Sequence, residues 1–218
     1  MAEGLPRLPP GRHGLDRAFV VRNQRDRLTA GVIAVVARKG YWASTITEIC
    51  AEAGLSRRTF YSYFGGKEEC FLDAVERVMG YLFASAREAA ADAEDWPSAV
   101  RVRMLALLEV FAANADLVRF GWVAPLRAGQ GLLPVYHQNI DGILALLNEG
   151  RPADTDRRPP RLIQQSIVAG TMALLAARVE AEDEEEPRLT ELLSDLVEIF
   201  LAQYLDREKA MVVASGSA

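Results

Sequence analysis

The stretch from Thr45 to Lys67 constrains the fold of this chain more than any other, because it marks the ends of two short helices. Thr45 followed three residues later by Glu48 is a capping box, in which each side chain accepts from the other residue's backbone amide. Gly54 supplies a left-handed stop, and Ser56 is an N-cap for the next helix. Two short helices joined by so tight a turn predict a helix-turn-helix.

The second of these helices is predicted over Arg57 to Phe64, before Gly65 and Gly66 break it. Phe60 and Phe64 lie four residues apart and share a face, which we assign to packing. At 100° per residue the polar side chains point elsewhere, where they can reach bases and phosphates. These residues are Arg57, Arg58, Thr59, Tyr61, Ser62 and Tyr63.

The rest of the chain also has helical periodicity, and no segment alternates as a half-buried strand would. We therefore predict an all-α fold. Residues 148–160 and the acidic run 180–186 are interpreted as solvent-exposed connections, and residues 211–218 as a frayed, disordered tail. Further helices are expected at about 22–39, from Lys67 onward, from Asp95-Trp96-Pro97, and at about 117–123, 134–147, 161–180 and 189–207.

Charge is distributed unevenly along the chain. Residues 1–67 contain 11 Lys and Arg against five acidic residues, a balance of +6, and the remaining residues carry −11, which together give the overall −5. A basic N-terminal third favours a polyanionic partner for that third alone, although a locally basic solvated surface explains the charge equally well.

Residues 1–21 form a separate basic segment, in which Arg7, Arg12, His13 and Arg17 stand among glycines and prolines. We expect it to be extended and flexible. Its guanidinium groups suit a DNA minor groove. An idle tail is the alternative interpretation.

Several functional classes are disfavoured. The chain has no GxSxG, HExxH, P-loop or dinucleotide-binding motif, so we predict no enzyme activity and no cofactor. His13 and His137 are too few for a zinc site, and Cys50 and Cys70 are interpreted as small buried hydrophobes. The apolar stretch 162–177 is interrupted by polar residues and falls short of a membrane span. Without an apolar signal segment at its start, the protein is expected to be cytoplasmic.

The stretch 40–75 resembles the DNA-binding domain of the TetR family of bacterial transcriptional regulators. The elements that carry the resemblance are Gly40, the run 45–49 (TITEI), the turn 53–56 (AGLS), Thr59-Phe60-Tyr61 with Phe64, and Lys67-Glu68. On this basis residues 22–67 are predicted to be a three-helix DNA-binding domain. Residues 68–210 are predicted to be a helical domain for ligand binding and dimerisation.

The resemblance implies a homodimer that binds a double-stranded DNA operator with its third helices in successive major grooves. Residues matching Thr45, Tyr61 and Lys67 typically contact phosphates in this family, and positions matching Arg57, Arg58, Thr59 and Tyr63 usually read bases. Arg57, Arg58, Tyr61 and Lys67 are interpreted as having no folding role. The complete predicted set of DNA contacts is Thr45, Thr47, Arg57, Arg58, Thr59, Tyr61, Ser62, Tyr63 and Lys67.

The resemblance also implies a small-molecule effector among the middle helices and a dimer interface made by the last two helices. Core packing is the competing explanation for both sets of apolar residues, and a helical ligand-binding or interaction module without operator binding is the alternative function. The predicted ligand contacts are Met79, Phe83, Met104, Leu108, Phe111, Phe120, Trp122, Tyr136, Asn139 and Gln165.

Overall fold

The computed structural model describes residues 16–153, 155, 157–181 and 188–216. Within these residues every regular element is a helix, which confirms the all-α prediction. The chain divides into two compact units, an N-terminal unit (Met1–Val78) and a C-terminal unit (Met79–Ala218). Helix α4 (Lys67–Ala89) begins in the first unit and ends in the second.

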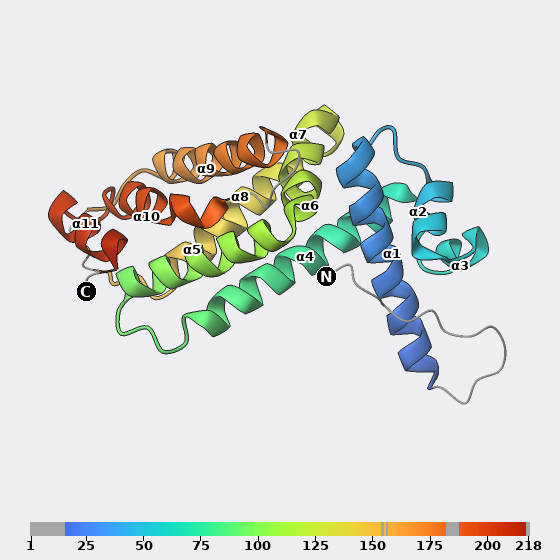
Figure 1. Cartoon of the computed structure of the whole chain (residues 1–218), viewed down its shortest axis with the longest axis horizontal. Helices are drawn as coiled ribbons and strands as arrows, with labels where there is room; N and C mark the ends of the chain where they lie inside the picture. The colour runs from blue at the N-terminus through green and yellow to red at the C-terminus, as the bar shows by residue number, and fades with distance from the viewer. Residues whose placement is uncertain (1–15, 154, 156, 182–187, 217–218) are drawn as a thin grey trace. The chain divides into compact units, whose positions relative to one another are not determined.

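The N-terminal unit is built on α1 (Arg17–Lys39), α2 (Ile46–Ala53), α3 (Arg57–Tyr61) and the start of α4, with α2 packed between α1 and α3 (Figure 1). Its core includes the fully buried Leu28, Phe60 and Phe71. Gly31 lets α1 and α2 approach closely, because a Cβ there would lie 2.9 Å from the carbonyl oxygen of Ile49. Cys50 and Cys70 are buried free cysteines, as predicted.

Two predicted boundaries in this unit were wrong. Helix α1 starts at Arg17 instead of about Arg22, because the Asp16 carboxylate accepts a hydrogen bond from the Ala18 amide and caps the helix. Residues 17–21 of the predicted flexible arm are therefore helical, and residues 1–15 lie outside the described part of the chain. Helix α3 ends at Tyr61, three residues before Phe64, and closes in a turn.

The C-terminal unit packs helices α5, α8, α9 and α10 around an apolar core. Asp95 caps α5 by accepting from the Ser98 amide, and Trp96-Pro97 opens that helix as predicted. The elements are α5 (Trp96–Ala113), α6 (Ala115–Val118), the π-helix η1 (Arg119–Val123), α7 (Ala124–Ala128), the 3-10 turn η2 (Gly129–Gly131), α8 (Leu133–Asn148), α9 (Arg161–Ala181), the 3-10 turn η3 (Leu189–Leu192), α10 (Leu193–Leu201) and α11 (Arg207–Ser215).

The predicted single helix over residues 189–207 is wrong. The chain turns after α10, where Tyr204 is fully buried and its hydroxyl donates to Gln164 at 2.7 Å. Asp206 then caps α11, which packs back on α10. The predicted frayed tail is also wrong for residues 211–215, which are helical with Ala214 buried. Of the predicted acidic connection, residues 182–186 lie outside the described residues.

Helix α9 is long and apolar enough to cross a membrane by length and composition, although the sequence analysis disfavoured a membrane span. The core helix of a soluble protein can meet the same criteria, but only 22% of the qualifying segment is buried in the chain. Leu162, Ile163 and Leu174 are exposed on this helix. Helix α9 therefore carries an apolar surface that the rest of the described chain leaves uncovered.

Candidate nucleic-acid interface and ligand cavity

The start of α2 is fixed by the predicted capping box. The Glu48 amide donates to the Thr45 hydroxyl at 3.2 Å, and the Thr45 amide donates to the Glu48 carboxylate at 3.0 Å. Lys39 also forms an ion pair with Glu48. The Lys39 ammonium and the Thr45 donors lower the pKa of the Glu48 carboxyl to about 2. Thr45 and Thr47 are both exposed at this helix start, where backbone amides and the helix dipole favour an anion.

A side chain of α1 supports the turn between α2 and α3. Gly54 adopts the left-handed conformation with φ 60°. Its carbonyl accepts from the guanidinium of the buried Arg27 at 2.9 Å. Ser56 caps α3 by accepting from the Thr59 amide at 3.0 Å. The helix-turn-helix is therefore confirmed, and Arg27 is a supporting residue that the sequence analysis missed.

The outer face of α3 presents Arg57, Arg58, Tyr61 and Ser62 to solvent. Tyr61 is 49% exposed, and the Arg57 guanidinium lies 6.0 Å from its ring centroid. Within the described chain, neither Arg57 nor Arg58 forms an ion pair, whereas Arg25, Arg38 and the α4 residue Arg77 each do. Among the residues that the structure places, the two α3 arginines are thus positive charges without an ion-pair partner.

Two predicted base-reading residues also contribute to the fold. The Tyr63 hydroxyl donates to the Gln24 side chain at 2.7 Å and ties the end of α3 to α1. The Thr59 hydroxyl lies 2.9 Å from the Ser56 hydroxyl within the N-cap. Both side chains are half-buried, so they are less available than Arg58 or Tyr61.

Lys67 was predicted to have no folding role, and this interpretation is wrong. Its ammonium donates to the carbonyls of Tyr41 at 2.7 Å and Ser44 at 2.9 Å, and it lies 4.3 Å from the Tyr41 ring centroid. Burial lowers the pKa of this ammonium group. Lys67 therefore fastens the loop that leads into Thr45. An ammonium carries three donors, so one remains for a phosphate.

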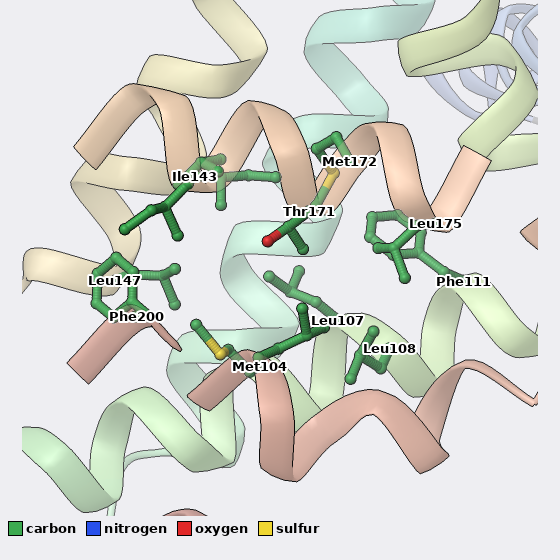
Figure 2. A pocket seen from close by; sticks show the side chains of 13 residues that line it. Met104, Leu107, Leu108, Phe111, Ile143, Leu147, Thr171, Met172, Leu175 and Phe200 are labelled. Atoms are coloured by element: carbon green, nitrogen blue, oxygen red, sulfur yellow. The ribbon is translucent and has the colours of Figure 1, made fainter. Parts of the chain in front are cut away.

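The C-terminal unit contains a small apolar cavity of about 30 Å³. Figure 2 shows its lining side chains pointing into a common space, with the Thr171 hydroxyl among otherwise apolar groups. The walls come from α5, α8, α9 and α10. The lining residues are Met104, Leu107, Leu108, Phe111, Ile143, Leu147, Ile167, Val168, Thr171, Met172, Leu175, Leu196 and Phe200.

Among the predicted ligand contacts, Met104, Leu108 and Phe111 line this cavity, and the other predicted residues do not. Trp122 lies behind the wall, with its ring edge-on to Phe111 at 5.2 Å between centroids. Asn139 is buried and donates to the Gly121 carbonyl at 2.9 Å. Gln165 donates to Asp141 at 2.7 Å. The remaining residues, buried or half-buried away from the cavity lining, are Met79, Phe83, Phe120 and Tyr136.

The fold and surface described above define a helix-turn-helix protein with an attached helical domain. Residues 29–74 match the family model described as "Bacterial regulatory proteins, tetR family". This segment contains the C-terminal part of α1, all of α2 and α3, and the start of α4. The N-terminal unit is therefore similar to the DNA-binding part of the tetR family of bacterial regulatory proteins, as the sequence predicted.

Two curated relatives match parts of the chain. An uncharacterized HTH-type transcriptional regulator, YerO of Bacillus subtilis, is 37% identical over 60 residues, which are 28% of this chain and 21% of that protein. The HTH-type transcriptional repressor SCO4008 of Streptomyces coelicolor is 30% identical over 108 residues, 50% of this chain and 53% of that protein. The chain thus spans about a fifth and about half of these relatives.

A solved structure extends the likeness in fold to the C-terminal unit. The transcriptional regulator FadR from Bacillus subtilis, solved in complex with stearoyl-CoA, is similar with a TM-score of 0.67 at 18% sequence identity. The match covers 82% of this chain and 97% of FadR. The helical domains of the two proteins therefore share an architecture. At 18% sequence identity this likeness shows a common fold and nothing further.

Proposed function

We propose that this chain is a cytoplasmic, homodimeric TetR-type regulator of transcription that binds a palindromic DNA operator and is released from it by a small, largely apolar ligand. The observation that carries the proposal is the outer face of α3, where Arg57 and Arg58 are exposed next to Tyr61 and form no ion pair with any residue that the structure describes. Such a face fits the major groove, since arginine recognises guanine edges and phosphates.

Phosphate contacts complete the proposed interface. The exposed N-terminus of α2 at Thr45 and Thr47 suits a backbone phosphate, because the first helix of a helix-turn-helix crosses the DNA backbone. Lys67, fastened beneath the same loop, adds a positive charge there. Ser62 stays a proposed contact, and Thr59 and Tyr63 stay proposed contacts of lower accessibility.

The apolar surface of α9 supports dimerisation through the last helices. Leu162, Ile163 and Leu174 on α9 are exposed, and so is Ile199 on α10. A second copy of the chain would cover these side chains and place two helix-turn-helix domains on one DNA duplex. Such dimers bind half-sites about 34–36 Å apart. A monomer by light scattering at micromolar concentration would contradict this part of the proposal.

The proposed effector is a molecule with a long apolar part, such as a fatty acyl chain. The lining of the cavity supports this class, because Thr171 is the one polar side chain among the lining residues. The stearoyl-CoA complex of FadR, which has a similar fold, supports it as well. Since α4 runs from Lys67 to Ala89, it is the proposed route by which ligand binding alters the DNA-binding unit.

The proposal is tested by measuring binding of the full chain to DNA from directly upstream of its own gene, by mobility shift or fluorescence anisotropy. Arg58→Ala should cost about 1–3 kcal/mol and relax sequence preference, because it removes a base contact. Lys67→Ala should instead weaken all DNA alike and reduce the salt slope by about one.

Arg127→Ala, which removes the same charge from the C-terminal unit, is the matched control and should bind as the original chain does. Equal loss in the Arg58 and Arg127 variants would show that only net charge matters. No binding to any upstream DNA would favour the alternative, a helical ligand-binding or interaction module.

A further inference from the structure

Trp42 is a large apolar side chain on the outside of the N-terminal unit. It lies in the loop between α1 and α2 and is 67% exposed. The other two tryptophans, Trp96 and Trp122, are 4% and 1% exposed. Isolated exposed tryptophans are uncommon in protein surfaces and enriched where surfaces become covered by a partner. Its exposed indole is therefore a candidate contact for a binding partner of this unit.

The loop that carries Trp42 is held in place on both sides. The Lys67 ammonium donates to the carbonyls of the flanking residues Tyr41 and Ser44. The Ser44 hydroxyl donates to the Gly40 carbonyl at 2.7 Å. The buried Tyr41 ring stands edge-on to Phe71 at 5.1 Å and to Trp42 at 5.2 Å. Because the backbone of this loop is already held in place, a partner that covers Trp42 does not have to order the loop.

The position of this loop identifies the partner. Trp42 precedes the α2 N-cap Thr45 by three residues, and the Lys67 ammonium lies 5.8 Å from its ring centroid. In a helix-turn-helix the first helix crosses the DNA backbone, so its N-terminus lies beside a phosphate. The apolar ring of Trp42 lies next to a helix start that suits a phosphate and next to the positive charge of Lys67. This arrangement matches the alternation of sugars and phosphates along a DNA strand.

We propose that Trp42 packs against a deoxyribose of the DNA backbone at the edge of each operator half-site, next to the phosphate at Thr45. This inference rests on the proposed DNA-binding function. Trp42 then contributes affinity without sequence preference, because every nucleotide offers the same sugar. Lys67 is a positioning residue for Trp42 as well as a positive charge near the phosphate.

The affinity test compares Trp42→Ala with the original chain on the same upstream DNA at several salt concentrations. Burying the ring predicts affinity lower by about ten-fold at every salt concentration. The salt slope should be unchanged, since an apolar contact releases no counterions. Tyr81→Ala, an aromatic of 43% exposure in the C-terminal unit, is the matched control and should bind normally.

A second measurement uses the tryptophan fluorescence of the full, unsubstituted chain. Because Trp96 and Trp122 are buried, acrylamide should quench mainly Trp42 in the free protein, and DNA should protect it from quenching. Trp42→Phe keeps an apolar ring and guards against misfolding of the alanine variant. It should retain most of the affinity.

Three results would overturn the inference. One is unchanged affinity of Trp42→Ala on DNA that the original chain binds tightly. Another is a changed salt slope. The third is low acrylamide quenching of the DNA-free protein, which would mean that another protein surface, such as a second copy, already covers Trp42. If the original chain binds no upstream DNA at all, the proposed function fails instead.

Discussion

The candidate sites of the two units differ in exposure and in polarity. In the N-terminal unit the proposed DNA-contact residues are charged or polar and most of them are exposed, and caps and hydrogen bonds from α1 and Lys67 anchor them. In the C-terminal unit the candidate ligand site is an apolar cavity of about 30 Å³ lined by four helices. In the proposed function the first site meets DNA with little rearrangement, whereas the second has to expand to admit an acyl chain.

This difference has a consequence for regulation. A ligand can shift a conformational equilibrium only if it binds one conformation better than the other. A preformed cavity of ligand size would allow binding without any change. A cavity that must open couples binding to movement of the helices that line it, so ligand binding selects an expanded C-terminal unit.

The largest expected effect is a loss of stability when a side chain of the cavity wall is truncated. It tests whether the walls are tightly packed. Phe111 is fully buried, lines the cavity and contacts the Trp122 ring. Phe111→Ala should lower the free energy of unfolding by about 3–5 kcal/mol, measured by chemical denaturation. Leu126→Ala, exposed in the same unit, should change it little. A loss of less than about 1 kcal/mol for Phe111→Ala would mean that the cavity walls are already loose.

The next effect concerns coupling between the two units. Stearoyl-CoA, used as a probe, should lower the operator affinity of the full chain about 5- to 150-fold, the usual range for allosteric coupling. Leu108→Trp adds volume to the cavity wall and should blunt this response while DNA binding stays measurable. If the probe raises the melting temperature but leaves operator affinity unchanged, ligand binding and DNA binding are uncoupled.

The smallest expected effect concerns pH and the capped start of α2. Because the folded-state pKa of Glu48 is about 2, below its ordinary value of 4.5, its ionised form stabilises the fold. That contribution is fully present above pH 4.5 and is lost as the pH falls toward 2. Glu48→Gln should therefore flatten the fall in melting temperature over this range. Glu52→Gln, which removes an exposed acid from the same helix, should leave it unchanged.

The sequence predicted the N-terminal unit well because its signals are local. The capping box at Thr45 and the stop at Gly54 act within a few residues, so the ends of α2 follow from the chain itself. The role of Lys67 could not be read in this way, since its partners at Tyr41 and Ser44 are distant in sequence. The sequence signal for Trp42 as a surface contact is weaker, because it consists only of an aromatic side chain outside any helical period.

The C-terminal unit was harder to predict because tertiary packing decides its details. The turn after α10 contains neither glycine nor proline, and it forms because Tyr204 is buried against other helices. The cavity is lined by residues from α5, α8, α9 and α10, whose registers no local pattern sets. The sequence therefore could not show that Met104, Leu108 and Phe111 line the cavity, whereas Trp122 packs against Phe111 outside the lining.

The π-helix Arg119–Val123 gives the chain a tolerance for changes in length. It interrupts a helical run that continues from α6 into α7, and a π-turn holds one residue more than an α-turn. Deleting a single residue there restores ordinary helical winding while the flanking helices keep the faces they bury. A one-codon deletion in this segment during evolution would therefore shorten the chain without changing which faces α6 and α7 bury.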